Sequence, residues 1–440
     1  MKKNTVTLIV SILFISLQTL AQSINQAISF QDSLRIALEK NPKPKSKDIQ
    51  ILALKDRTTA AWLGFLPTFS ESCDYTQDKS TTRVLGIPSR TSDIATGCST
   101  SIDLNIFKGG RGYYEAKTAE ARQKAMAAIF NSTNPLVENS KGALATLLLN
   151  TYTAIIMNQD TLELLDSITD ILNRALAATS DPDDINAYKA FMATVAIQKQ
   201  NALNKITLSK EDYLFEVTQV APDRLDSFDD FINSFQIPVT PEEALAQAKL
   251  SSPDLKRRVY ELQQADYATK IAWSQAYMPT IDVYYSNYFS NDIDRLDSNN
   301  NYNYHNQSAG ISLSWIFSFQ KKNNLSAARK ELQSAQLEQL AVIDDLKHNI
   351  KKTYMNYEAT SSVLEKYRQK YEMAKDQAYS DIERLESKNP ISRTDLINDL
   401  NDYSNAGSNL IYAKQGVVIL KFTVQQVTGT LFTNVGVAVE

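Results

Sequence analysis

Few residues of this sequence are of the types that carry out chemistry. Among its 440 residues there are two cysteines, Cys73 and Cys98, and two histidines, His305 and His348. No histidine lies near a cysteine in the sequence, so the ligand spacing of a zinc site is absent. Neither histidine has a nucleophile or a carboxylate at a catalytic spacing, and no phosphate-binding loop is present. The sequence therefore predicts no metal, no cofactor and no enzyme.

Carboxylates are more numerous, and those of one predicted helix are interpreted as solvated. Asp376, Asp381, Glu383 and Glu386 form a run that is typical of a helix face in contact with water. The formal net charge is −4, with 43% hydrophobic and 22% charged residues. This composition allows a buried core and lacks the basic excess of a nucleic-acid-binding protein. We therefore expect no nucleic-acid partner.

The first residues predict export. Lys2 and Lys3 precede an apolar run that ends in Thr19-Leu20-Ala21, which is the pattern of a secretory signal peptide over 1–21. A membrane anchor is the alternative, but the run is shorter than the roughly 20 residues of a spanning helix. No later stretch is long and apolar enough to span as a helix, so a membrane crossing, if one occurs, must use strands.

The rest of the sequence contains two similar halves. Identical residues occur in the same order in both, and a proline and an Ile-Phe pair follow them in each half. The matched residues are Leu34 and Leu245, Ala37 and Ala248, Pro42 and Pro253, Ala61 and Ala272, and Trp62 and Trp273. This shared order indicates a duplication, with repeats at 22–238 and 239–431 and a C-terminal tail at 432–440.

Each repeat is predicted to contain a short helix, a middle helix, a strand hairpin and a long helical hairpin. In the first repeat these are 31–40, 44–65, about 68–107 and about 111–216, followed by a linker at 221–238. In the second they are 241–250, 253–277, about 280–319 and about 323–428. Asn131-Ser132-Thr133-Asn134-Pro135 predicts a break in the first long helix, because proline removes a backbone donor.

Hydrophobic residues recur every seven positions along 323–388, which is the pattern of a coiled-coil seam. These positions are Ile343, Ile350, Tyr357, Leu364, Tyr371, Ala378 and Leu385. An uninterrupted helix of this extent would be on the order of 100 Å long. The seam therefore predicts an elongated helical hairpin.

The predicted strands alternate apolar with small polar residues, most clearly at 281–290 and 311–319. A half-buried sheet in a soluble protein shows the same alternation. Serine in place of charged residues on the polar face, with aromatic residues near the strand ends, favours the wall of a membrane barrel.

The two cysteines fall in the first predicted strand pair. Folding that pair so that Cys73 opposes Cys98 also places Phe69 opposite Ile102, and exported thiols can be oxidised. The same register places Ser70 opposite Ser101. A disulfide is one interpretation. Two free thiols are the other, because antiparallel register is uncertain by a residue or two.

Short motifs in a fixed order resemble the outer-membrane efflux protein family, the TolC-like channels of tripartite exporters. The resemblance covers about 27–431. The motifs are Ser33-Leu34 to Asn41-Pro42, Ala244-Leu245 to Ser252-Pro253, Leu66-Pro67, Met278-Pro279, Ile106-Phe107-Lys108-Gly109-Gly110-Arg111, Ile391-Ser392-Arg393-Thr394-Asp395-Leu396-Ile397 and Gly429-Thr430-Leu431. The sequence departs from the family in lacking the usual glycine at both helical turns and paired glycines at 319–322.

The resemblance implies a mainly α protein with a small β part, in which a long α-helical coiled-coil barrel adjoins a transmembrane β-barrel. A homotrimer with four strands per chain would form both. The implied function is an exit duct in the outer membrane, with a periplasmic helical extension, for a tripartite efflux or type I secretion system. It would passively conduct drugs, small molecules or proteins. Its partners would be a periplasmic adaptor (membrane fusion) protein, an inner-membrane pump and outer-membrane lipid.

The resemblance also implies site residues. Asp395 falls where family members carry an aspartate at the periplasmic constriction, and Asn398 falls where a second acidic ring would lie. Three copies of Asp395 would form a ring that attracts cations. The alternative is that Asp395 only caps or solvates the first turn of its helix. The adaptor-docking turns would contain Ser180, Asp181, Pro182, Asn389, Pro390, Ile391 and Ser392.

A periplasmic adaptor or a coiled-coil structural spacer is the alternative function. An adaptor would contain one helical hairpin and a membrane or lipid anchor, whereas this sequence predicts two hairpins and no anchor after signal cleavage. The sequence therefore favours the channel.

Overall fold

The structure is a computed structural model that describes residues 28–84, 87–219, 221–222, 225–294, 301–387 and 391–434. The predicted signal peptide and the tail beyond 434 lie outside the described residues. The chain divides into two compact units. Unit 1 takes in residues up to 50, 127–256 and 341 onward, and unit 2 takes in 51–126 and 257–340. Each unit therefore combines segments of both predicted repeats.

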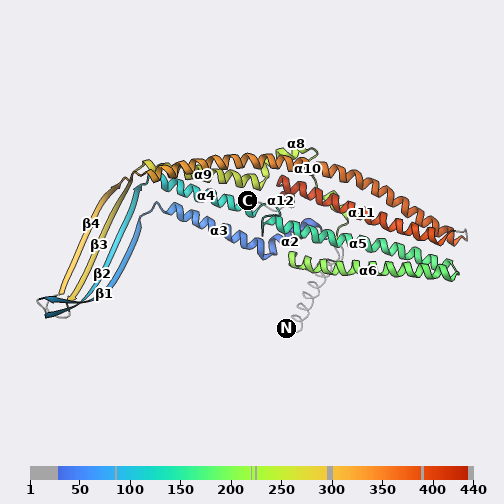
Figure 1. The fold of residues 1–440 in the computed structure, drawn as a ribbon, viewed down its shortest axis with the longest axis horizontal. Coiled ribbons are helices and arrows are strands. Elements are labelled where there is room, and N and C mark those ends of the chain that lie inside the picture. The colour runs from blue at the N-terminus through green and yellow to red at the C-terminus, as the bar shows by residue number, and fades with distance from the viewer. Residues whose placement is uncertain are drawn as a thin grey trace, which may run out of the picture. The chain divides into compact units, whose positions relative to one another are not determined.

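The elements follow the same order in each half of the chain (Figure 1). The first half contains α2 (Phe30–Lys40), α3 (Pro42–Leu63), β1 (Thr68–Val84), β2 (Ile87–Phe107), α4 (Arg111–Phe130), α5 (Lys141–Ala178), α6 (Pro182–Val217) and α7 (Phe228–Ser234). The second contains α8 (Pro241–Ser251), α9 (Pro253–Tyr277), β3 (Thr280–Asp294), β4 (Asn301–Ser314), α10 (Phe319–Glu386), α11 (Arg393–Thr428) and α12 (Leu431–Asn434).

Helix ends lie where the local sequence provides caps. Ser29 caps α2 by accepting a hydrogen bond from the Asp32 amide, and Ser140 caps α5 by accepting one from Ala143. The predicted break around Pro135 is confirmed, since no helix covers 131–140 between α4 and α5. None of the helices in the described part of the chain combines the length and the apolar character needed to span a membrane.

The predicted linker contains a helix that the sequence analysis did not predict. Helix α7 begins after Ser227, whose hydroxyl accepts from the Asp230 amide, and it lasts only seven residues. Its Phe228 and Phe231 are 1% exposed. The rings of Phe30 and Tyr152 lie 5.1 and 5.2 Å from that of Phe231. A segment this short has too few turns for its periodicity to be recognised, so contacts distant in sequence decide its conformation.

Helices of unit 1 pack along the predicted seam. All seven heptad positions of α10 are buried or half-buried, and Ala378 is fully buried.

Helices α5 and α11 approach closely at Gly407, where a Cβ atom would lie 2.5 Å from Leu164 Cδ2. At Gly416, farther along the same helix, a Cβ atom would lie 3.5 Å from Thr360 Cγ2, which is ordinary contact. Gly407 is therefore required for packing, and Gly416 is not.

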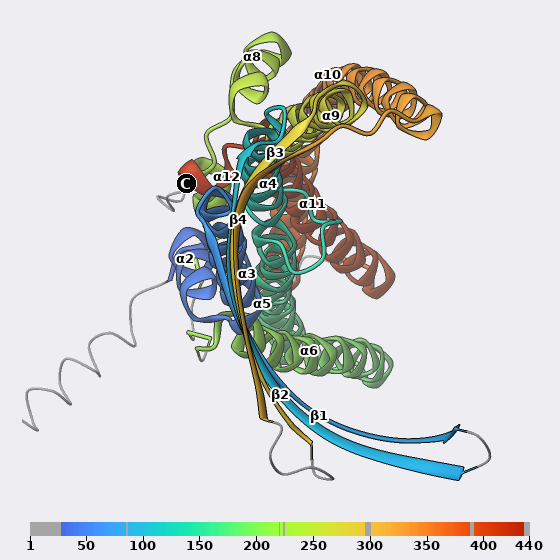
Figure 2. The same cartoon turned by 90° about the vertical axis from the view of Figure 1, so that its left-hand side faces the viewer.

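Unit 2 contains one antiparallel sheet in the order β1-β2-β3-β4, and its strands curve together along their length (Figure 2). The register confirms the predicted pairing of Phe69 with Ile102. Four serines, Ser70, Ser101, Ser286 and Ser308, lie side by side across the four strands. The sulfur atoms of Cys73 and Cys98 form a disulfide between β1 and β2. The four serines give one face of the sheet a continuous row of hydroxyls.

The expected end of the second strand hairpin at about 319 is wrong. Strand β4 ends at Ser314, and Phe319 already belongs to α10. The cause is the partner strand, because Ser314 pairs with Thr280, the first residue of β3, and Pro279 before it has no N–H to donate. Trp315 and Phe317 continue the apolar alternation beyond the sheet and are about two-thirds exposed.

The two strand-to-helix connections use different residues. Between β2 and α4, Gly109 and Gly110 have φ angles of 62° and 79°, a region that residues with a Cβ rarely adopt. A Cβ atom on Gly109 would also collide with Met278 and Ser274 of the neighbouring chain segment. Between β4 and α10 there is no glycine, and the connection is made by 315–318.

A pair of glycine substitutions in α11 tests the close approach of α5 and α11. Gly416→Ala is expected to raise stability by up to about 1 kcal/mol, because alanine favours the helix. Gly407→Ala is expected to lower stability by about 1–3 kcal/mol through overpacking against Leu164. Thermal loss of the helical circular-dichroism signal measures both. Equal shifts in the two variants would contradict the packing described here.

The disulfide predicts a specific peptide mass. Digestion of the purified chain without reductant should yield the peptides containing Cys73 and Cys98 as one linked species. Reduction before digestion should separate them, with each sulfur gaining a proton. Peptide masses that do not change on reduction would rule out the bridge in the exported protein.

Candidate functional site

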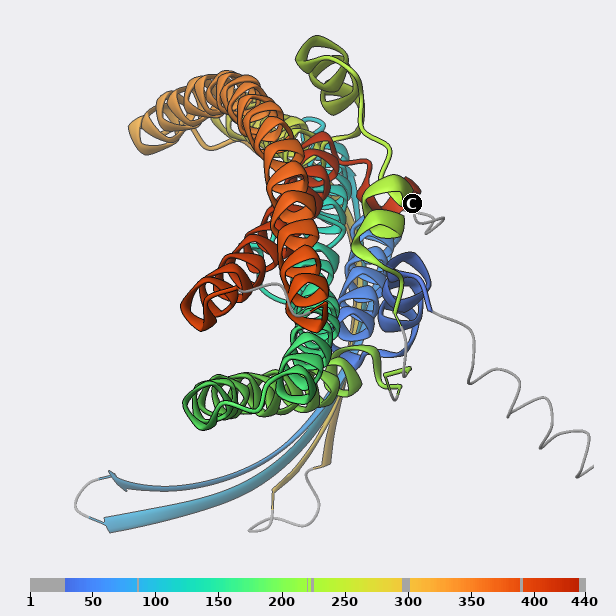
Figure 3. The ribbon, with the colours of Figure 1, turned by 90° about the vertical axis from the view of Figure 1, so that its right-hand side faces the viewer.

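The predicted site residues lie at the turns of two helical hairpins in unit 1. Figure 3 faces both turns, with α5 and α6 in green and α10 and α11 in orange to red. At the first turn Ser180, Asp181 and Pro182 are exposed. Asp181 caps α6, because its carboxylate accepts a hydrogen bond of 2.9 Å from the Asp183 amide. Pro182 occupies the first helical position, where its missing N–H costs nothing.

The second turn is partly outside the described residues, and Asn389 and Pro390 belong to that part. Ile391 is half-buried and packs against the core of unit 1. Ser392 caps α11 by accepting a hydrogen bond of 3.2 Å from the Thr394 amide. Both turns therefore begin the returning helix with a side-chain cap in place of glycine.

Asp395 and Asn398 share one exposed face of α11. Leu396 and Leu400, on the opposite face, are fully buried. Because Ser392 provides the cap, the Asp395 side chain is not needed for that role, and it forms no hydrogen bond or ion pair with another described residue. Asp402, seven positions after Asp395, is exposed on the same face. Asp402 is not among the predicted site residues, although the heptad spacing could have identified it.

Two ion pairs join the hairpins close to these turns. Arg174 of α5 donates two hydrogen bonds of 2.8 Å to the two carboxylate oxygens of Glu386 on α10. The bonds from Arg174 hold the pKa of Glu386 below its ordinary value. Arg393 of α11 lies 3.7 Å from Asp184 of α6. Sequence alone could not pair these residues, because the partners are far apart in the chain.

The interpretation of the acidic residues of α10 as a solvated face is partly wrong. Asp376 and Glu383 are exposed, as expected, but Glu386 is paired with Arg174. Asp381 is only 1% exposed. It lies three residues after Ala378 and four before Leu385, so its position belongs to the seam. The charge of Asp381 suggested a position in contact with solvent, whereas its spacing from Ala378 and Leu385 indicated a buried position.

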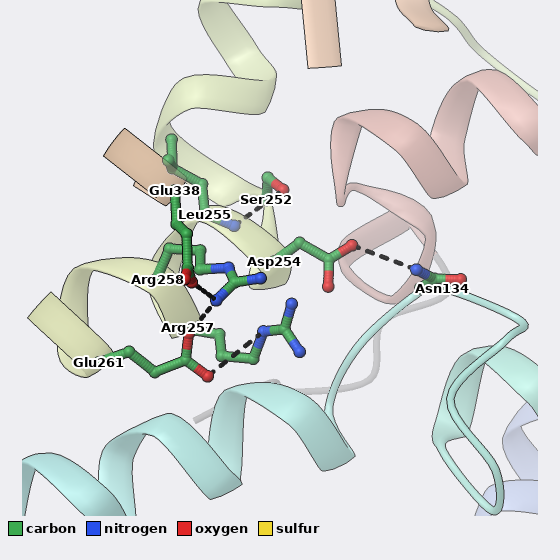
Figure 4. Close-up of polar contacts among 8 residues, drawn as sticks. All are labelled: Asn134, Ser252, Asp254, Leu255, Arg257, Arg258, Glu261 and Glu338. Carbon is green, nitrogen blue, oxygen red and sulfur yellow. Dashed lines mark hydrogen bonds and ion pairs between the residues drawn. The ribbon is translucent and has the colours of Figure 1, made fainter. Parts of the chain in front are cut away.

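Two arginines of unit 2 pair with nearby carboxylates, although the Nε atom of each is buried without a hydrogen-bond partner (Figure 4). Arg258 of α9 donates hydrogen bonds of 2.8 Å to Glu261 and 2.7 Å to Glu338, and the second bond ties α9 to α10. Arg257 forms a longer ion pair of 3.9 Å with Glu261. In unit 1, the same figure shows Asn134 donating to Asp254 over 3.5 Å, and the Leu255 amide donating to Ser252 over 3.4 Å. These contacts join neighbouring elements within each unit.

Among the described residues, no group of His, Cys, Asp or Glu has the geometry to hold a metal ion. Among the carboxylates near the turns, Asp181 caps a helix, and Glu386 and Asp184 form ion pairs. Asp395 and Asp402 are exposed on α11, and Asp381 is buried. Such an arrangement can attract cations and join helices.

Comparisons with known proteins identify the fold. No family model matches the sequence, and no curated protein matches it. The outer membrane protein VceC of Vibrio cholerae superimposes with a TM-score of 0.65 at 15% identity, covering 93% of this chain and 97% of that one. The open state of the MtrE outer membrane channel of Neisseria gonorrhoeae superimposes with a TM-score of 0.64 at 14% identity. The alignment covers 91% of this chain and 89% of that one.

A third solved structure is similar over the same extent. The CmeC outer membrane channel of Campylobacter jejuni superimposes with a TM-score of 0.61 at 15% identity, covering 91% of this chain and 86% of that one. Each of the three alignments covers more than nine-tenths of this chain. The predicted resemblance to the TolC-like outer-membrane efflux proteins is therefore confirmed for the fold: this chain has the mainly helical fold, with one small antiparallel sheet, of the outer-membrane channels.

Proposed function

We propose that the chain forms a passive exit duct in the outer membrane, with its long helices extending into the periplasm. The observation that carries the proposal is the four-stranded sheet, which has a row of serines on one face and exposed apolar residues on the other. The exposed set includes Phe69, Tyr285, Phe289, Ile311 and Leu313. A wall with lipid on one side and water on the other requires this division.

The duct is a homotrimer in this proposal. The sheet ends at β1 and β4, whose outer edges have no partner strand among the described residues. Four strands cannot close a barrel, since the smallest membrane barrels have about eight strands and an interior filled by side chains. Two chains would give such a filled barrel. Three chains give about twelve strands and space for a conduit.

The long helical hairpins suit a tunnel with partners at its far end. Their turns would contact a periplasmic adaptor. The first turn would do so through the exposed Ser180, Asp181 and Pro182, and the second through Asn389, Pro390, Ile391 and Ser392. The adaptor would link the duct to an inner-membrane pump of an efflux or type I secretion system. The conducted molecules would be drugs, other small molecules or proteins.

Cross-linking tests the oligomeric state. The full chain, folded in mild detergent, should yield a product of three protomers when treated with a lysine-reactive reagent. Lys79, Lys108 and the lysines of α10 offer attachment points on the exterior of the single chain. A cross-linking ladder that stops at the dimer, at concentrations where the helical signal is retained, would contradict the trimer.

Cell fractionation tests the location of the protein. Release of the protein with the periplasmic fraction would favour an adaptor or a spacer.

Substitutions on the exposed face of α11 test the constriction. In planar bilayers Asp395→Asn should lower cation selectivity and block by multivalent cations, because a ring of three carboxylates is removed. Asn398→Asp should have the opposite effect, because it adds a second acidic ring one turn away. Trimer assembly should be unchanged in both variants.

Asp376→Asn provides the control, since Asp376 is an exposed carboxylate of α10 outside the predicted constriction. Unchanged selectivity in assembled Asp395→Asn would show that the ring lies elsewhere. The carboxylates of the first turn, Asp181, Asp183 and Asp184, would then be the next residues to substitute.

A further inference from the structure

The four connections between strands and helices of unit 2 lie at one end of the sheet. Because neighbouring strands are antiparallel, β1 and β3 begin at this end, and β2 and β4 end there (Figure 1). Each connection, taken together with the adjoining helical turn, is part of what we call the connection belt. The belt consists of 60–67, 108–114, 274–279 and 315–322. It therefore belongs to a single compact unit.

The belt exposes aromatic side chains at every connection. They are Phe65 before β1, Tyr113 after β2, Tyr277 before β3, and Trp315, Phe317 and Phe319 after β4. The most exposed of them, Phe319, is 79% exposed. Exposed apolar side chains gathered in this way mark a contact with a membrane or with protein. Aromatic rings in particular are enriched where a membrane meets water.

The apolar face of the sheet begins directly beside the belt. Phe107 of β2 pairs with Ile281 of β3, which pairs with Leu313 of β4, so these three side chains form a row on one face. Phe107 and Leu313 are exposed. The belt thus adjoins a surface that would contact acyl chains in the duct proposed above.

The belt contains four cations, Lys108, Arg111, Lys321 and Lys322, and no carboxylate. Lys321 Nζ donates a hydrogen bond of 2.9 Å to the Ile316 carbonyl, and Arg111 Nε donates one of 2.9 Å to the Lys108 carbonyl. None of the four forms an ion pair with another residue in the described part of the chain. Lys322 is exposed, and the other three are partly exposed. Their charges are therefore available to an external anion.

Carboxylates near the belt do not cancel this positive charge. In the sheet, Asp103 and Asp282 share the face of the serine row, whereas Glu71 of β1 lies on the apolar face. In the next turn of each helix, the carboxylates, Asp56 and Glu115, are outnumbered by cations. The apolar face is therefore bordered by an excess of positive charge at this end of the sheet.

We propose that the connection belt binds the headgroups of anionic phospholipids. Lys108 and Lys322 contact the lipid phosphates, and Trp315 and Phe317 lie at the boundary between headgroups and acyl chains. Each Lys or Arg near an anionic membrane surface strengthens binding roughly fivefold. A zwitterionic headgroup carries an ammonium group of its own, so it gains less from these cations. The proposal rests on the duct proposed above, because it requires the apolar face of the sheet to lie in a membrane.

Quenching of tryptophan fluorescence by brominated lipids tests the proposal. The sequence has three tryptophans, so Trp62→Phe with Trp273→Phe leaves Trp315 as the only reporter. The full chain is reconstituted in phosphatidylcholine vesicles in which part of the lipid is brominated, either as phosphatidylglycerol or as phosphatidylcholine. The two quenching curves give the relative binding constant of the anionic lipid. It should be about threefold or more, and added salt should reduce it.

Substitution of two cations locates the effect. Lys108→Gln with Lys322→Gln should bring the relative binding constant close to one, and it leaves the Lys321 hydrogen bond in place. Lys351→Gln is the matched control, because Lys351 is an exposed lysine of α10 that belongs to unit 1. It should retain the wild-type preference. Retention of the preference in the double lysine variant would show that other groups select the lipid, and the proposal would be wrong.

If the phenylalanine variant does not fold, the wild-type chain reports the same preference, because all three tryptophans belong to unit 2. Equal quenching by the two brominated lipids would overturn the proposal and leave the duct intact. Loss of the preference when inorganic phosphate is added at constant ionic strength would assign the cations to free phosphate, and would also overturn it.

Two further outcomes separate this proposal from the proposed duct. Vesicles that carry the protein but do not quench Trp315 would show that protein, such as a second copy of the chain, covers the belt. That result would overturn lipid binding by the belt alone. Failure of the chain to float with the vesicles would contradict the duct and the lipid site together.

Discussion

The packing of long helices along one apolar seam is the interaction on which unit 1 depends. The seam buries small and aromatic residues, and it brings α5 and α11 so close that Gly407 leaves no space for a Cβ atom beside Leu164. An isolated helix gains little stability in water, so helices of this length need such contacts along their extent. The first turn, at Ser180 to Pro182, can then be exposed, because the seam already fixes the helices and Asp181 caps α6.

Most of the fold follows from local patterns in the sequence. Heptad spacing predicted the seam of α10, and Asn134-Pro135 predicted the break before α5. Placing Cys73 opposite Cys98 predicted the register in which Phe69 pairs with Ile102. Two elements escaped prediction for different reasons. Helix α7 is stabilised by aromatic contacts with distant segments, and the end of β4 is set by where its partner strand begins. Neither cause is visible in the residues of the element itself.

The candidate site was less predictable than the fold, because its chemistry depends on pairs of residues. The exposure of Asp395 and Asn398 agrees with their place on the face of α11 opposite Leu396 and Leu400. The pairing of Arg174 with Glu386 joins residues 212 positions apart and has no signal in one sequence. Asp381 was mispredicted for a different reason. Its charge led to the prediction that it contacts water, whereas its heptad position places it in the buried seam.

The carboxylates near the hairpin turns therefore have different surroundings, although all of them are Asp or Glu side chains. Glu386 is held ionised by two hydrogen bonds from Arg174, and Asp395 faces water on the first turn of α11, where the helix dipole favours a negative charge. The neighbouring Asp381, together with burial, raises the pKa of Asp399 to about 6, so the charged form of Asp399 is disfavoured. One end of the hairpins thus contains Glu386, whose charged form is favoured by its partner, and Asp399, whose charged form is disfavoured. An electrostatic account of this end must therefore treat the buried and the exposed groups separately, because salt screens the exposed charges far more than the buried ones.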